Sequence, residues 1–128
     1  METLKENEIR IGNWVHIRQT KNNEQIGGIE ENGRFLTKGY KSSYSSIECL
    51  EPIPITEEWL VKLGFEKEYN FFQKYISNIE SLSWSEESGL ALHRRRIGNT
   101  HIFRHIKHVH TLQNLVHALT GNELTIKS

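Results

Sequence analysis

Helical periodicity is confined to two short segments, and this confinement most constrains the fold that the chain can adopt. Residues 57–63 follow Thr56, a favourable N-cap, and precede Gly64, a residue typical just beyond a helix C-terminus. Residues 110–119 carry apolar side chains at every third or fourth position, which is the pattern of an amphipathic helix. Because the chain has 128 residues and little other helical pattern, strands must supply most of its core.

The remaining apolar segments are short, rich in β-branched and aromatic residues, and separated by polar or glycine-containing turns. This pattern is typical of short strands. We therefore predict an α+β fold with an N-terminal small curled sheet or SH3-like barrel, then a helix, antiparallel strands and a C-terminal helix. The expected strands cover residues 9–11, 14–17, 25–30, 34–37, 46–50, 71–76, 79–84, 90–96, 100–109 and 123–126.

The connector Pro52-Ile53-Pro54 is the one internal boundary that the sequence indicates. Each proline favours extended backbone in the residue before it, so this segment is expected to join two structured parts. We predict a single compact domain over residues 1–128, with residues 1–51 (β-rich) and 55–128 (α+β) as candidate sub-units.

The composition argues against membrane association and against several kinds of enzyme. No apolar run approaches the length of a membrane span, and residues 1–12 lack the apolar stretch of a signal peptide, so we expect a cytoplasmic protein. All acidic residues are glutamates, which excludes Asp-based triads and the EF-hand calcium loop. The single cysteine, Cys49, allows no intramolecular disulfide. Since P-loop, Rossmann and nucleophile-elbow patterns are also missing, we expect no cofactor and no catalytic site.

The net charge is zero, but the charges are distributed unevenly along the chain. Residues 1–87 carry ten basic and fifteen acidic residues, whereas residues 88–128 carry six basic and one acidic residue. Between Ser88 and Asn122 there is no acidic residue at all. Such an asymmetry predicts that the second part of the chain faces an anionic partner.

The basic residues concentrate on the hairpin expected over residues 90–109. Arginine binds phosphates and carboxylates through two parallel hydrogen bonds, and a two-stranded ribbon can lie along a nucleic-acid backbone. Three interpretations stay open: a partner that is nucleic acid or nucleoprotein, an acidic protein surface, or a solvated hairpin neutralised by the glutamates of residues 1–87. The candidate binding residues are Arg94, Arg95, Arg96, Arg104, Lys107, His93, His101 and His105.

Histidines recur in the same part of the chain, and their spacing could bring His101 near His105 or His108 near His110. Imidazole is a common metal ligand and a common general acid or base. However, the chain has no HExxH motif and no cysteine pair, and nothing in the spacing singles out two histidines. A metal site and a metal-independent nuclease therefore remain secondary alternatives, and we expect no bound metal.

The second predicted helix has a polar face, made of His110, Thr111, Asn114 and His117. These side chains lie opposite the apolar stripe of the same helix. We expect solvent to cover this face, with an interface as the alternative.

Three segments stand out by their order and spacing: residues 9–13 (IRIGN), 52–65 (PIPITEEWLVKLGF) and 109–121 (VHTLQNLVHALTG). In these segments the chain resembles a family of uncharacterised bacterial and prophage-encoded small proteins. The resemblance implies a mobile-element background and a compact fold with two short helices, and it carries no established activity. The hairpin over residues 90–109 is more basic than the resemblance leads one to expect, which suggests adaptation to a particular anionic partner.

The leading functional prediction is a non-enzymatic phage or mobile-element accessory protein that binds a host protein or nucleoprotein through the basic hairpin. Its most concrete form is inhibition of a host defence nuclease, an anti-CRISPR-like role. The first alternative is a module that binds RNA or DNA directly, which steep salt dependence would reveal. The second is a small His-dependent nuclease, which would lose its activity on single His→Ala changes.

Overall fold

The computed structural model describes residues 4, 8–18, 20–30, 34–38, 44–45, 47–94 and 98–126. Backbone contacts divide the chain into two compact units. Unit 1 comprises Met1–Pro54 with His108–Asn114, and unit 2 comprises Ile55–Lys107 with Leu115–Ser128. The C-terminal helix thus contributes its first half to unit 1 and its second half to unit 2. That residues 1–128 behave as a single domain stays a prediction.

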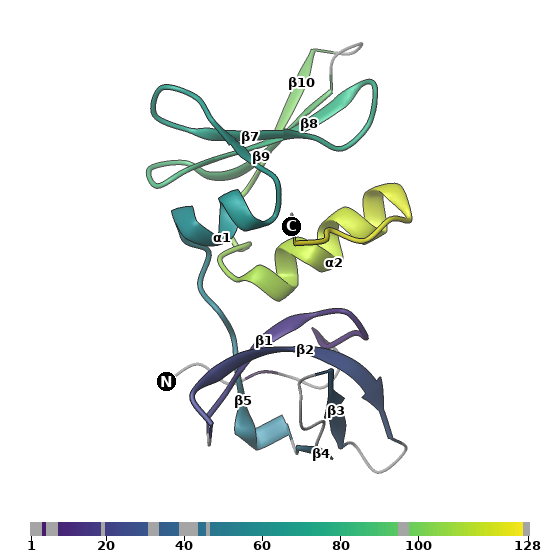
Figure 1. Cartoon of the computed structure of the whole chain (residues 1–128). Coiled ribbons are helices and arrows are strands. Elements are labelled where there is room, and N and C mark those ends of the chain that lie inside the picture. The colour runs from purple at the N-terminus through teal and green to yellow at the C-terminus, as the bar shows by residue number, and fades with distance from the viewer. Residues whose placement is uncertain are drawn as a thin grey trace. The chain divides into compact units, whose positions relative to one another are not determined.

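Unit 1 contains an antiparallel sheet in the order β4-β3-β2-β1-β5 (Figure 1). A register shift between Ile26 and Gly28 interrupts the pairing of β2 with β3, and such bulges bend a strand. In the described part of the chain β5 pairs only with β1, so the sheet is open and an SH3-like barrel is not confirmed. The strands are β1 (Trp14–Ile17), β2 (Asn22–Ile29), β3 (Phe35–Thr37), β4 (Tyr44–Ser45) and β5 (Leu50–Glu51).

The core of unit 1 follows from the alternation of side chains along its strands. Val15 and Ile17 lie two residues apart on β1 and are both buried, as are Ile26 on β2 and Phe35 on β3. Burial of each such side chain stabilises the fold by roughly 1.5–3 kcal/mol. Among the described residues, this cluster contains Leu4, Ile9, Val15, Ile17, Ile26, Phe35 and Leu50.

Two strands predicted in unit 1 are wrong. Residues 10–13 form a turn, in which the Asn13 backbone N–H donates to the Arg10 carbonyl at 3.0 Å and Gly12 adopts a φ of 100°. The Asn13 side chain accepts a further hydrogen bond from the Arg10 N–H, and such local bonds compete with strand pairing. Residues 46–50 were expected to be extended, but Ile47–Cys49 form a short 3-10 helix (η2) before β5.

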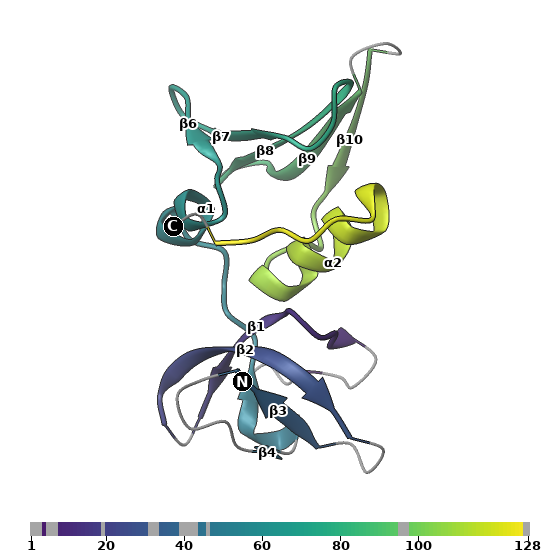
Figure 2. The ribbon, with the colours of Figure 1, turned by 45° about the vertical axis from the view of Figure 1, so that its right-hand side comes forward.

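Unit 2 contains a second antiparallel sheet in the order β10-β9-β8-β7-β6, in which each strand pairs with its neighbour along the chain (Figure 2). The antiparallel strands predicted after the first helix are therefore confirmed. Leu82, Leu90 and Leu92 are buried on the two central strands. The strands are β6 (Glu66–Lys67), β7 (Phe72–Tyr75), β8 (Glu80–Ser85), β9 (Gly89–Arg94) and β10 (Asn99–Phe103).

Both predicted helices are present, which confirms the α+β class. Helix α1 (Glu57–Lys62) begins where the Trp59 N–H donates to the Thr56 hydroxyl at 3.3 Å. It is followed by Gly64, whose φ of 91° suits a helix C-terminus. Helix α2 (Val109–Thr120) is likewise followed by Gly121, with a φ of 76°.

Of the last two predicted strands, residues 100–109 are too long and residues 123–126 are not a strand. β10 ends at Phe103 and not at Val109, because the chain turns back there: the Ile106 N–H donates to the Phe103 carbonyl at 3.3 Å, and Ile106 is buried. The segment from Glu123 to Ile126 forms no strand. In the described ranges, no helix is long and apolar enough to cross a membrane.

Candidate functional site

The basic hairpin, β9 with β10, distributes its predicted binding residues over both faces of the second sheet. The register pairs His93 with Thr100 and Leu92 with His101. Because successive strand residues point to opposite faces, His93 and Thr100 share one face, whereas Arg94 and His101 share the other. The predicted residues that the structure describes on these two strands are therefore spread over both faces of the sheet.

His93 is held within the sheet. Its Nε2 lies 2.9 Å from the Ser83 hydroxyl on β8, and its Nδ1 lies 3.1 Å from the Thr100 hydroxyl on β10. Both ring nitrogens thus have partners on the adjacent strands. The imidazole links three strands, and this structural role explains its presence without a ligand.

Arg94 is ion-paired to the strand beside it. Its Nε lies 3.2 Å from Glu80 Oε2, and the two residues are directly opposite each other in the β8–β9 register. The Glu80 side chain is only 17% exposed, whereas that of Arg94 is 46% exposed. A carboxylate held this close offsets part of the Arg94 charge, which weakens the attraction of this arginine for a polyanion.

His101 and His105 flank the ring of Phe103. The His101 and Phe103 ring centroids are 4.6 Å apart, and those of Phe103 and His105 are 6.1 Å apart. Both histidines are exposed. Within the described ranges, no group of three His, Cys or Glu side chains is arranged as a metal site.

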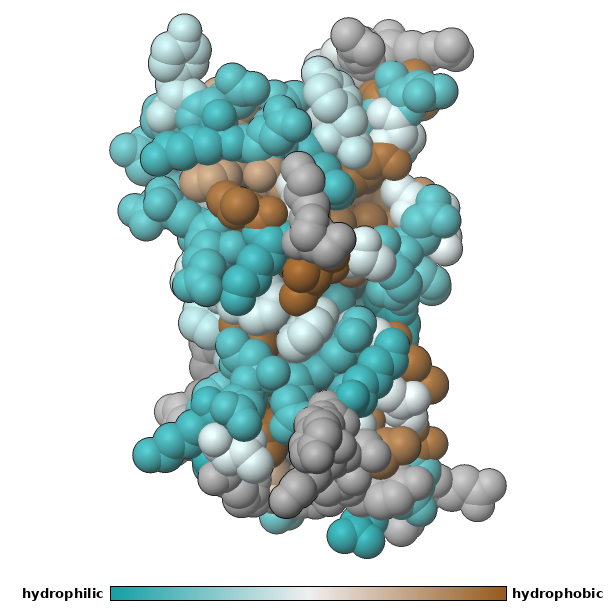
Figure 3. Space-filling view, in the orientation of Figure 1, coloured by the Kyte–Doolittle hydropathy of each residue, from teal (hydrophilic) through white to brown (hydrophobic). Residues whose placement is uncertain are grey.

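Arg104 and Lys107 line a hollow of about 630 Å³ in unit 2. Its wall combines apolar and charged side chains, and both signs of charge are present. Hydrophobic surface interleaved with hydrophilic surface is also visible over the second sheet in Figure 3. We call the hollow that Arg104 and Lys107 line the mixed-charge hollow. Its apolar residues are Ile55, Trp84, Ile102 and Ile106, and its charged residues are Glu86, Glu87, Arg104 and Lys107.

The structure thus brings Arg104 and Lys107 together but separates them from the His93 and Arg94 side chains described above. Arg95 and Arg96 lie outside the described residues. Sequence reasoning missed the acidic side of the hollow and most of its apolar wall. Glu86 is in the β8–β9 connection, two residues before the acid-free stretch begins. This position in the sequence could have indicated that Glu86 lies close to the basic hairpin.

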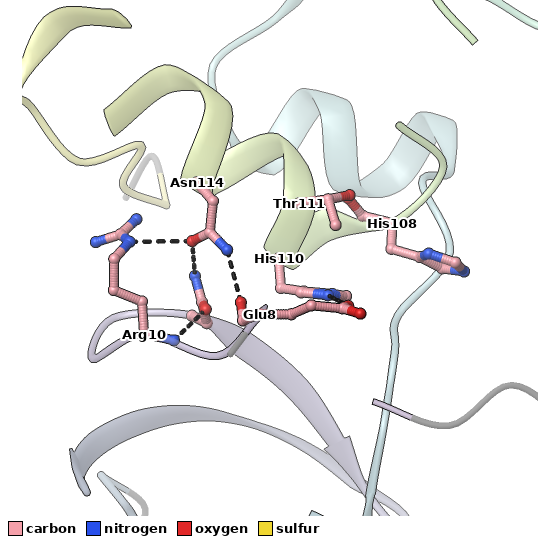
Figure 4. A network of polar contacts seen from close by, with 7 residues as sticks. Glu8, Arg10, His108, His110, Thr111 and Asn114 are labelled. Carbon is pink, nitrogen blue, oxygen red and sulfur yellow. Dashed lines mark hydrogen bonds and ion pairs between the residues drawn. The ribbon is translucent and has the colours of Figure 1, made fainter. Parts of the chain in front are cut away.

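A second polar cluster, in unit 1, joins the start of α2 to the turn at residues 10–13 (Figure 4). The Asn114 side-chain amide donates to the Glu8 carbonyl at 2.7 Å. Its Oδ1 accepts from Arg10 Nε at 3.0 Å and from Asn13 Nδ2 at 2.9 Å. The polar face of α2 is therefore not simply solvated, and the prediction is wrong for Asn114 and for His110, which is buried.

Gln113 completes this connection from a fully buried position. Its Oε1 accepts a hydrogen bond from the Trp14 N–H at 2.8 Å, and its Nε2 donates to the Gly12 carbonyl at 2.9 Å. Two of the segments that stand out in the sequence, residues 9–13 and 109–121, thus meet through buried polar contacts. Their amide side chains build the fold of unit 1.

His110, another member of this cluster, has an altered ionisation. The side chain is 1% exposed, and its Nε2 lies 3.1 Å from Glu8 Oε2. Burial lowers the pKa of His110 below 6.5, against the opposing effect of the Glu8 carboxylate. The imidazole is therefore neutral at pH 7, so Nε2–H donates to Glu8. Nδ1 is buried and has no hydrogen-bond partner among the described residues, and the His108 ring is stacked with a centroid distance of 6.0 Å.

No known protein family matches the chain, and comparisons with curated proteins and with solved structures give no match either. The functional argument consequently depends on the geometry of the described residues. That geometry comprises a structural polar cluster in unit 1 and an exposed hollow of mixed charge in unit 2.

Proposed function

We propose that the protein acts without catalysis, by binding a partner protein or the protein part of a nucleoprotein through the mixed-charge hollow. The observation that supports this proposal is the composition of the hollow. Ile102 is 47% exposed there, and Arg104 and Lys107 share the wall with Glu86 and Glu87. An apolar centre with polar groups around it is the usual anatomy of a protein–protein contact.

The same composition disfavours a naked nucleic acid as the main ligand. A phosphate backbone needs cations that are not already neutralised. Arg94 has Glu80 beside it, and two exposed glutamates line the hollow with Arg104 and Lys107. A protein surface can present both signs of charge and an apolar side chain for Ile102, whereas a phosphate backbone presents only negative charge.

The test is affinity capture of the tagged full-length chain from its host lysate, with and without nuclease treatment. We expect a discrete protein that survives the nuclease and is depleted at least about tenfold when Arg104→Ala and Lys107→Ala are combined. The matched control combines Lys21→Ala with Lys38→Ala. It removes the same charge from exposed positions of unit 1 and should leave capture intact.

Recovery of nucleic acid alone, lost on nuclease treatment, would contradict the proposal and support a direct RNA- or DNA-binding module. Equal capture by both double variants would place the interface elsewhere. In its most specific form the proposal is inhibition of a host defence nuclease. A nuclease effector among the captured proteins, whose cleavage slows when the purified chain is added, would support that form.

A further inference from the structure

The charged side chains of the mixed-charge hollow come from two chain segments at the same end of the second sheet. The acidic turn, residues 86–88, joins β8 to β9 and carries two glutamates. The basic segment, residues 104–107, follows β10 and carries one arginine and one lysine. Because Leu90 near the start of β9 pairs with Phe103 at the end of β10, the acidic turn ends beside the start of the basic segment.

Hydrogen bonds determine the course of the backbone in both segments. The Ser88 N–H donates to the Ser85 hydroxyl at 3.1 Å and closes the acidic turn. The basic segment begins with the turn at Phe103 described above, and the Lys107 carbonyl accepts from the Ile55 N–H at 3.0 Å. A ligand of the hollow therefore meets charges whose backbone is already ordered, which lowers the entropic cost of binding.

The four charges of the hollow do not neutralise one another by direct contact. All four side chains are exposed, and none makes an ion pair or a side-chain hydrogen bond within the part of the chain that the structure describes. Arg94 differs, because Glu80 beside it is its ion-pair partner. Both signs of charge in the hollow are thus available to a ligand.

This arrangement disfavours a ligand with a single sign of charge. An acidic segment is attracted by Arg104 and Lys107 but repelled by the glutamates of the acidic turn, and the reverse holds for a basic segment. A segment that carries both signs gains from both sides of the hollow. Between the charges lie the half-buried Trp84 and the 47% exposed Ile102, which offer apolar contact.

We propose that the mixed-charge hollow binds a dipolar segment of the partner protein. Its cationic end lies at the acidic turn, its apolar centre contacts Trp84 and Ile102, and its anionic end lies at the basic segment. The hollow of about 630 Å³ is within the range of roughly 300–1,000 Å³ that is typical of ligand sites, so it can hold several side chains. This inference rests on the proposed function, because it specifies the chemistry of the partner that the same hollow binds.

Three synthetic peptides test this charge selection on the full chain. Each is fluorescently labelled, has roughly ten residues and blocked ends, and shares a centre of leucine and valine. The dipolar peptide has lysines before the centre and glutamates after it, the acidic peptide has glutamates on both sides, and the basic peptide has lysines on both sides. We expect a saturable rise in anisotropy with the dipolar peptide, at an affinity at least about tenfold above that of the other two.

Charge reversal in the hollow should change which peptide is preferred. Glu86→Lys combined with Glu87→Lys makes all four charges positive, so we expect the acidic peptide to bind best. Arg104→Glu combined with Lys107→Glu makes all four charges negative, so we expect the basic peptide to bind best. A structural loss alone would weaken every peptide and would not exchange their order.

The matched control combines Glu66→Lys with Glu68→Lys. These glutamates are exposed, and they lie in and just after β6, the strand at the opposite edge of the same sheet from β10. The control changes the net charge of the chain by the same amount as the reversal of the acidic turn, and it should keep the preference for the dipolar peptide. Far-ultraviolet circular dichroism verifies that all three double variants fold.

Equal affinity for the three peptides, or binding of none, would overturn the dipolar segment. An unchanged order of peptides in both hollow variants would place the bound peptide elsewhere and overturn the assignment. A concentration-dependent dimer that either hollow variant abolishes would assign the hollow to a second copy instead. If lysate capture depends on Arg104 and Lys107 while the dipolar peptide is not preferred, the dipolar segment fails and the proposed function stands.

Discussion

At the scale of single residues, His110 is the side chain whose surroundings most restrict its chemistry. It is buried at the start of α2, its Nε2 contacts Glu8, and its Nδ1 has no hydrogen-bond partner in the part of the chain that the structure describes. Burial removes the charged imidazolium from water, which is the main physical reason for the lowered pKa of His110; Glu8 opposes this effect, and His108 adds to it. The sequence suggested proximity of His108 and His110 by spacing alone, but burial depends on distant residues such as Glu8.

This ionisation predicts a pH-dependent stability. Since the pKa of His110 is lower in the folded state than its unfolded value of 6.5, the unfolded chain binds more protons between the two values. The free energy of unfolding should therefore fall as the pH decreases below about 6.5. We expect His110→Gln, which keeps a donor for Glu8, to flatten this decrease. Urea denaturation from about pH 8 to pH 5 measures it, and an identical pH dependence in the variant would contradict the assignment.

At the scale of secondary-structure elements, Gln113 connects α2 to the turn that precedes β1. Replacement by alanine removes the side-chain acceptor of the Trp14 N–H and one of two side-chain donors to the Gly12 carbonyl, which keeps its hydrogen bond from Gln25 Nε2 at 2.9 Å. Loss of a buried hydrogen-bond partner costs about 1–3 kcal/mol, so we expect Gln113→Ala to reduce the free energy of unfolding by about that amount. Chemical denaturation measures the loss. The control, Gln73→Ala, shortens a half-buried glutamine on β7 and should cost less than about 1 kcal/mol.

The elements that the sequence predicted well are those whose ends are determined locally. Thr56 and Gly64 define α1 through contacts within a few residues, so a single sequence shows them. β10 is different, because its end depends on a turn that buries Ile106. Strand formers continue through Val109 in the sequence, and nothing local signals that the chain leaves the sheet at Phe103.

At the scale of the whole molecule, the sequence predicted the concentration of positive charge and offered its neutralisation by the glutamates of residues 1–87 as one interpretation, but it did not show which glutamates lie beside which arginines. Composition showed the acid-free stretch after Ser88. The sheet register then pairs Arg94 with Glu80, and hairpin geometry brings Glu86 to the same hollow as Arg104. These neighbours are separated by fourteen to eighteen positions along the chain, so spacing alone could not reveal them.

Because glutamates lie beside these arginines, a protein partner and a nucleic-acid partner should lose affinity to different extents as the salt concentration rises. If five basic residues all contacted phosphates, the nucleic acid would release about five counterions, and the affinity would fall by about 500-fold between about 50 and 200 mM salt. These residues are Arg94, Arg95, Arg96, Arg104 and Lys107. A protein partner held by Ile102 and by charges of both signs should lose less than about tenfold over this range, because apolar contacts are insensitive to screening. Titration of the captured partner at several salt concentrations measures the slope. A loss of several hundredfold would contradict the mixed-charge hollow as the principal contact and would make the arginines of the hairpin the residues to substitute next.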